Sequence, residues 1–108
     1  MSSGRSHPDD AERAERVASV RAGVAQALAA ADGAALAALL RADARWIDAA
    51  GVHEGPDASG RARAFAGQGG DWAATQVKGA HAVFRAADGR AVVAELRGGA
   101  VVWAAVAP

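Results

Sequence analysis

The residues with the clearest chemical potential in this sequence are a tryptophan and an aspartate two positions apart, Trp46 and Asp48. They lie in residues 39–48, where an amphipathic helix is predicted to end and a strand to begin. Residues two apart on a strand share a face, so the indole and the carboxylate point the same way. A carboxylate on a half-buried face is costly unless it has a partner. The pattern therefore predicts either a structural hydrogen-bond anchor or the polar end of a pocket.

Asp48 has two possible roles. As a catalytic general base it would need a pKa raised by burial, which the neighbouring indole could supply. As an anchor it would accept hydrogen bonds from the backbone of the following loop, such as residues 52–55, and hold the rim of a cavity. Perturbed acids are often structural, so the anchoring role is favoured, and the catalytic role stays open.

The other polar side chains carry weaker signals. His81 is expected to point outward, to solvent or a dimer partner. Glu95 and Arg97 share a strand face and could form an internal ion pair or an exposed cross-strand contact. His53 and Glu54 are adjacent, and no third ligand has a helpful spacing. No metal site and no cofactor are therefore expected.

Alanine dominates the sequence, so few large side chains can wall a cavity. Small residues let helices and sheet approach closely. Aromatic side chains serve both as ligand-stacking walls and as plain core packing. The predicted ligand-binding residues are Trp46, Phe65, Phe84 and Trp103.

Composition limits the classes of function. A chain of 108 residues that is 52% hydrophobic can form one modest core. The formal net charge is zero and the charges are interspersed, so no nucleic-acid or membrane partner is expected. There is no cysteine, which excludes disulfides and thiolate chemistry. No signal peptide or membrane span is recognised, so a cytoplasmic location is expected. The alanine and arginine bias is typical of a bacterial genome rich in G and C.

The first half of the chain is predicted to be mainly helical. We expect a disordered lead-in at residues 1–8 and a single domain at 9–108. Apolar spacing and the Asp32-Gly33 break indicate the elements. They are a helix to about residue 31, a helix at 34–41, a strand at 44–50, a loop at 51–57 and a helix at 58–67.

The second half is predicted to be a meander of antiparallel strands that begins near Trp72. Glycine-containing turns at Asp88-Gly89 and Gly98-Gly99 are typical of hairpins. Helices followed by such a sheet make an α+β domain. The expected strands after the first are 81–86, 91–97 and 100–106.

This order resembles the nuclear transport factor 2-like superfamily, and within it the SnoaL-like polyketide-cyclase group. The pattern L-x-A-D-A-x-W-x-D-x-x-G-x-x-x-G-P, at residues 40–56, resembles the end of its second helix, its first strand and the start of its third helix. Residues 77–84, followed by the two turns and the last strand, are similar to the domain appended to some extracytoplasmic-function sigma factors. The resemblance implies a cone-shaped curled antiparallel sheet, with three N-terminal helices packed in its concave face and a pocket at the open end.

The family includes ketosteroid isomerases, polyketide cyclases, dehydratases and binding modules, so the fold alone does not fix the function. We expect a cavity-forming domain that binds a small apolar or cyclic ligand, with a homodimer through the sheet. The first alternative is an isomerase, cyclase or dehydratase in which Asp48 is the general base, as the resemblance implies. The isomerases also use a tyrosine, and this chain has none. The second alternative is a protein-interaction scaffold whose cavity is filled by side chains.

Overall fold

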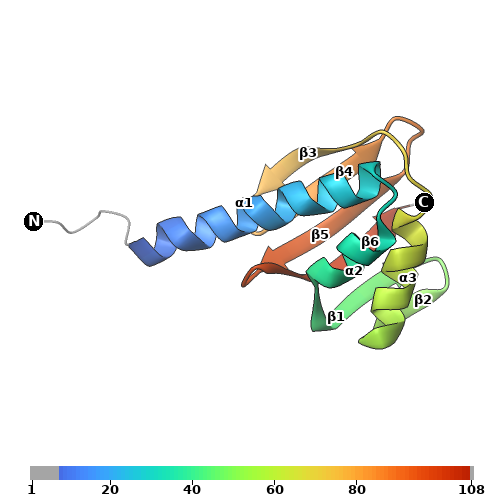
Figure 1. Cartoon of the computed structure of the whole chain (residues 1–108), viewed down its shortest axis with the longest axis horizontal. Helices are drawn as coiled ribbons and strands as arrows, with labels where there is room; N and C mark the ends of the chain where they lie inside the picture. Colours follow the sequence, from blue (N-terminus) through green and yellow to red (C-terminus); the bar gives the residue numbers. More distant parts are fainter. Residues whose placement is uncertain (1–7, 108) are drawn as a thin grey trace, which may run out of the picture.

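The computed structural model describes residues 8–107, which fold as three helices against one curled sheet of six strands (Figure 1). The elements are α1 (Pro8–Ala29), α2 (Gly33–Leu39), β1 (Leu40–Asp48), β2 (Gly51–Glu54), α3 (Pro56–Ala66), β3 (Trp72–Lys78), β4 (His81–Ala86), β5 (Ala91–Arg97) and β6 (Ala100–Ala107). The α+β class is thus confirmed. The lead-in predicted for residues 1–8 lies, up to residue 7, outside the described residues.

The order of strands across the sheet is β2-β1-β6-β5-β4-β3. The meander from β3 to β6 is antiparallel, as the glycine turns predict. The sheet expected to be antiparallel is mixed, because β1 runs parallel to β6 and pairs Arg45 with Trp103. The meander starts with β3 at the far edge of the sheet and ends with β6 beside β1, and the hairpin turn after β5 gives β6 the same direction as β1.

The turn between the first two helices is defined by local hydrogen bonds. After α1 the backbone N–H of Asp32 donates to the carbonyl of Ala27 at 2.9 Å, and Ala31 takes a positive φ of 57°. This is the arrangement that commonly closes a helix. The Asp32 carboxylate then accepts the backbone N–H of Ala35 at 3.0 Å and caps α2. The predicted break at Asp32-Gly33 is therefore confirmed.

The stretch expected to be a loop, residues 51–57, is partly a strand. β2 pairs antiparallel with β1, with Asp48 opposite Gly51 and Arg45 opposite Glu54. A tight turn at residues 49–50 makes the pairing possible, because the Asp48 carboxylate accepts the backbone N–H of Ala50 at 2.9 Å. The strand β1 also begins at Leu40, four residues earlier than predicted.

The core lies between the helices and the concave face of the sheet. Trp46 is 2% exposed and Phe84 0%, and both pack against apolar residues of α1 and α2. The space enclosed there measures about 10 Å³, which is room for no more than one water molecule. The interior of the cone is thus filled by side chains. None of the helices within residues 8–107 is both long enough and apolar enough to cross a membrane.

Candidate functional site

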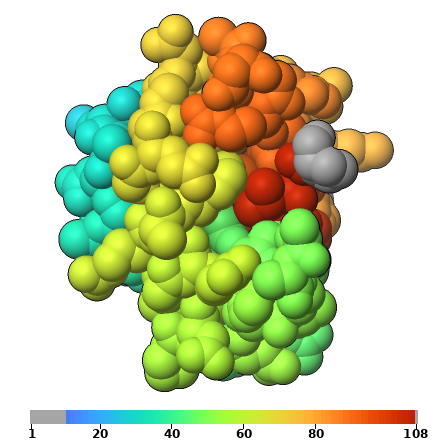
Figure 2. Space-filling model, turned by 90° about the vertical axis from the view of Figure 1, so that its right-hand side faces the viewer, coloured from blue at the N-terminus to red at the C-terminus, as the bar shows by residue number. Residues whose placement is uncertain are grey.

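An open groove lies at the end of the molecule where α3 meets the ends of β1 and β6. Figure 2 looks onto this end, with α3 in yellow-green, β1 and β2 in green and the end of β6 in red around a hollow. The groove has a volume of about 380 Å³, within the range of small-molecule sites. Its lining residues are Trp46, Asp48, Ala49, Arg61, Ala64, Phe65, Gln68 and Val106.

Aromatic rings form one wall of the groove. The ring centroids of Trp46 and Phe65 are 5.5 Å apart and tilted, and those of Phe65 and Trp72 are 5.6 Å apart, edge to face. These distances are typical of favourable aromatic pairs. Phe65 is half-buried, so part of its ring is available to a ligand, whereas Trp46 and Trp72 are buried beside it and only Trp46 also lines the groove.

Asp48 sits at the polar end of the groove, and both of its carboxylate oxygens are engaged. Oδ2 accepts from Arg61, with Nε at 2.8 Å and Nη2 at 2.7 Å. Oδ1 accepts the backbone N–H of Ala50 at 2.9 Å and lies 3.1 Å from His53 Nε2. The side chain of Asp48 is 14% exposed. The carboxylate therefore ties α3 to the β1–β2 hairpin.

These contacts favour anchoring over proton abstraction. Burial alone would raise the pKa of Asp48, but hydrogen bonds from Arg61, Ala50 and His53 outweigh it and hold the pKa below its ordinary value of 3.8. A carboxylate with a lowered pKa is a weak base near neutral pH. Its backbone partner is Ala50 and not the loop backbone at residues 52–55 that the sequence suggested, where only the side chain of His53 contacts the carboxylate.

We predict that Asp48→Asn destabilises the protein at neutral pH and reduces the loss of stability on acidification. Since folding lowers the pKa of Asp48, its ionised contacts contribute fully above the ordinary value of 3.8. Their contribution disappears as the pH falls through the lower pKa of the folded state. Denaturant titrations at several values between about pH 6 and pH 2 measure this dependence.

Asp43→Asn is the matched control for Asp48→Asn. Its ion pair with Arg41 also lowers the pKa of Asp43, but its side chain is 72% exposed. Exposed pairs contribute little to stability. An Asp48→Asn protein whose stability falls with acid as steeply as the wild type would contradict an anchoring role.

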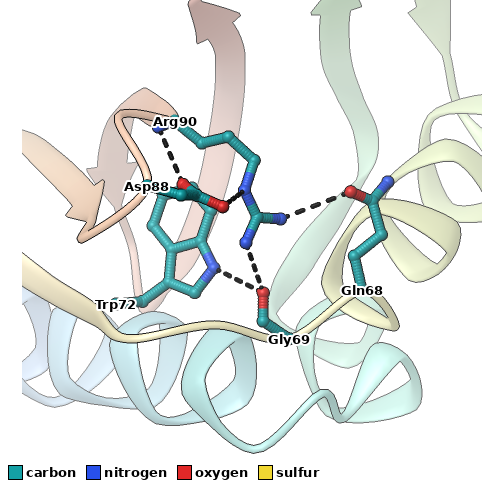
Figure 3. Close-up of polar contacts among 5 residues, drawn as sticks. All are labelled: Gln68, Gly69, Trp72, Asp88 and Arg90. Atoms are coloured by element: carbon teal, nitrogen blue, oxygen red, sulfur yellow. Dashed lines mark hydrogen bonds and ion pairs between the residues drawn. The ribbon is translucent and has the colours of Figure 1, made fainter.

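Gln68 at the rim of the groove is held by a cluster around Arg90 (Figure 3). The Arg90 guanidinium donates to Gln68 Oε1 at 3.3 Å, to the Gly69 carbonyl at 2.7 Å and to Asp88 Oδ2 at 2.7 Å. It also lies 5.1 Å from the ring centroid of Trp72, whose Nε1 donates to Gly69. The glycine-rich turn after α3 is thus fixed, and Gln68 with it.

The structure brings three of the predicted site residues together and separates two others from them. Trp46, Phe65 and Asp48 share the groove. Phe84 is fully buried in the closed core. Trp103 stands opposite Arg45 across the β1–β6 pairing, whereas Trp46 stands opposite Ala104. Side chains of directly paired strand residues share a face, so Trp103 lies on the outer face of the sheet, away from Trp46.

On that outer face, Trp103 Nε1 donates to Glu95 Oε1 at 2.8 Å, and Arg97 Nε pairs with the same carboxylate. These two hydrogen bonds lower the pKa of Glu95. His81 points outward, as predicted, with Nε2 3.6 Å from Glu95. A second groove, of about 470 Å³, runs beside this cluster and is lined by Arg41, Asp43, Arg45, Ile47, Glu95, Val102 and Trp103. The homodimer expected through this face of the sheet stays a prediction.

Among the described side chains of residues 11–107, no three His, Asp or Glu residues are grouped so that they could hold a metal ion. The two polar groove residues besides Asp48, which are Arg61 and Gln68, were not predicted from the sequence. Arg61 stands four residues before Phe65 on α3, the spacing that places side chains on one face of a helix, whereas Gln68 lies in the turn after the helix ends at Ala66. This spacing from the predicted ligand-binding phenylalanine is the signal that could have identified Arg61, and it does not extend to Gln68.

Comparisons with known proteins identify the fold. No family model and no curated protein matches the chain. Among solved structures, an NTF2-like protein of unknown function from Mesorhizobium loti is 26% identical, over 93% of this chain and 94% of that chain, with a TM-score of 0.66. An NTF-2 like protein of unknown function from Burkholderia xenovorans is 19% identical, over 88% and 84%, with a TM-score of 0.67. A protein from Catenulispora acidiphila with a ketosteroid isomerase-like fold is 19% identical, over 82% and 84%, with a TM-score of 0.56.

Proposed function

Because the chain has the nuclear transport factor 2-like fold, with a groove at the end where α3 meets the sheet, we propose that it binds a small apolar or cyclic ligand there. The motif at residues 40–56 supports a place in the SnoaL-like group of that fold. The observation that carries the proposal is the composition of the groove. A half-buried aromatic ring, Phe65, is flanked by polar groups that are already held in place, Asp48 with Arg61 at one side and Gln68 at the other.

The filled core moves the proposed ligand from the interior of the cone to its open end. The enclosed space of about 10 Å³ holds no organic molecule, whereas the groove measures about 380 Å³. Apolar pockets with a few fixed polar groups are the usual form of small-ligand sites. Polar groups that are already ordered also reduce the entropy lost on binding.

The test is a titration of tryptophan fluorescence with steroids, polycyclic ketones and short acyl compounds. We predict a saturable change with one of these classes, reported by Trp46 at the groove, that survives in a Trp103→Phe variant. Ala64→Phe is expected to weaken that binding about tenfold or more, because it places a ring in the groove; a loss of this size corresponds to about 1.4 kcal/mol.

Ala22→Phe is the matched control for Ala64→Phe, since both alanines are exposed on helices and only Ala64 lines the groove. Surface substitutions of this kind change stability by about 0.5 kcal/mol or less, so both variants should melt close to the wild type. Equal affinity in the two variants would place the ligand elsewhere on the molecule. Flat titrations across the whole panel would contradict the proposed function.

A second candidate function, a protein-interaction domain, is favoured by the filled core together with the outer face of the sheet. That face exposes part of Trp103, Ile47 and Val102 around the larger groove. Aromatic side chains in such positions are frequent at protein interfaces. Fluorescence titrations that show no binding of any ligand in the panel would favour this candidate function over ligand binding.

A further inference from the structure

We infer that the ligand of the groove at α3 carries a carboxylate, which binds to the outer edge of the Arg61 guanidinium. This inference rests on the proposed function, because it names the chemical class of the ligand in the same groove. Its starting point is the way in which Arg61 and Asp48 share their hydrogen-bonding groups.

Arg61 uses only one edge of its guanidinium to hold Asp48. Nε and Nη2 both contact Oδ2 of Asp48, at 2.8 and 2.7 Å. A guanidinium has five N–H donors arranged in a planar fork. The edge formed by Nη1 and the second hydrogen of Nη2 therefore remains for a ligand. Among the side chains that the structure describes, residues 11–107, no carboxylate other than Asp48 forms an ion pair with Arg61, whose side chain is 46% exposed.

Asp48 is poorly suited to bind a cationic ligand itself. Its two oxygens already face Arg61, Ala50 and His53, and its side chain is only 14% exposed. An incoming ammonium group would have to displace Arg61 from the carboxylate. The exposed charge at this end of the groove is thus the guanidinium, and its planar edge matches the two oxygens of a carboxylate.

The apolar part of the ligand is placed by Phe65, which follows Arg61 by four residues on α3. Residues at this spacing are neighbours on one face of a helix. A carboxylate on Arg61 would therefore have its attached ring over the half-buried ring of Phe65. Gln68 lies in the turn after α3 and lines the same groove. Its Oε1 is taken by Arg90, so its amide nitrogen is left to donate to a polar group at the far end of the ligand.

Three adamantane compounds test the inference, because they share one compact apolar cage and differ in the polar group. They are adamantane-1-carboxylate, adamantane-1-methanol and adamantan-1-amine. Binding is followed by NMR through the indole N–H signals of the three tryptophans. We expect the Trp46 signal to shift and that of Trp103 to remain unchanged, since only Trp46 lines the groove. The carboxylate should bind about tenfold tighter than the methanol, the typical gain from a charge-assisted hydrogen bond.

Substitutions then assign the preference to Arg61. Arg61→Gln should bring the affinities for the carboxylate and the methanol together. Arg61→Lys keeps a positive charge opposite Asp48 but lacks the planar fork, so it should lose most of the preference even if Arg61→Gln fails to fold. Arg85→Gln is the matched control, because Arg85 is exposed on β4 outside the groove. It should retain the full preference.

The outcomes separate this inference from the function on which it rests. Equal affinities for the carboxylate and the methanol, or tighter binding of the amine, would overturn the carboxylate inference and leave a groove that binds apolar rings. If none of the three compounds shifts the Trp46 signal, the groove does not accept such rings, and both proposals fail. A preference that survives in both Arg61 variants would place the carboxylate on another group.

Discussion

Replacing Phe84 with alanine is expected to lower the free energy of unfolding by about 3–5 kcal/mol, the usual cost of removing a large buried ring. Phe84 is 0% exposed and is one of the largest fully buried side chains. The surrounding core is rich in alanine, whose short side chains cannot move in to fill the space. Domains of this size are stable by only about 5–15 kcal/mol, so the loss would be a large part of the total. Urea titration monitored by circular dichroism measures it.

Phe65→Ala is the matched control, because it removes the same ring from the groove. Phe65 is half-buried, so we expect a smaller loss of stability, about 1–2 kcal/mol. Its main effect should be weaker ligand binding. The two phenylalanines were predicted to share one role, and this pair of variants separates a core residue from a groove residue. A Phe84→Ala protein as stable as Phe65→Ala would show that the core is less tightly packed around Phe84 than the structure indicates.

The second large effect is expected from Gly33→Ala, at the first residue of α2. A Cβ atom at Gly33 would lie 2.4 Å from the carbonyl oxygen of Arg63 and 2.8 Å from its Cγ. The carbonyl belongs to α3 and cannot rotate away, so α2 and α3 would have to separate. Overpacking of this kind costs about 1–3 kcal/mol. Because α3 carries Arg61 and Phe65, the affinity for any groove ligand should also fall. Thermal melting and the adamantane titration measure the two effects.

Gly60→Ala is the matched control for Gly33→Ala, and we expect it to change the stability in the opposite direction. Gly60 lies within α3, and a Cβ atom there would meet nothing within 4 Å. Alanine favours a helix over glycine by about 0.5–1 kcal/mol, so this variant should be more stable than the wild type. A stabilising effect of Gly33→Ala as well would contradict the close contact between Gly33 of α2 and Arg63 of α3.

Much of the architecture could be predicted from local signals. The two glycine turns fix the hairpins β4–β5 and β5–β6, because each turn type requires a positive φ that glycine adopts freely. Asp32 marks the boundary between α1 and α2 through its cap. The strand β2 was missed since Gly51, His53 and Glu54 lack the apolar alternation of a strand. Its pairing depends instead on the turn that Asp48 closes.

The candidate site was predictable only in part. The spacing of Trp46 and Asp48 was sufficient to place them on one face, and the structure puts both at the groove. The sequence could not show that Trp103 and Trp46 lie on opposite faces of the sheet, because this depends on which residues pair across two distant strands. An irregularity in the β5–β6 pairing, between Glu95 and Leu96, further shifts the alternation of faces. No local pattern records such a register.

The parallel pairing of β1 with β6 has a consequence for the synthesis of this protein on the ribosome. Arg45 pairs with Trp103, so a strand made early completes its hydrogen bonds only with the last strand of the domain. Until β6 has emerged, Trp46 lacks its neighbour Ala104 and the centre of the sheet is open between β1 and β5. Contacts so distant in sequence slow folding and leave apolar surface exposed in the meantime. The nascent chain therefore presents an unprotected strand edge, β1, that a chaperone can shield until β6 has emerged.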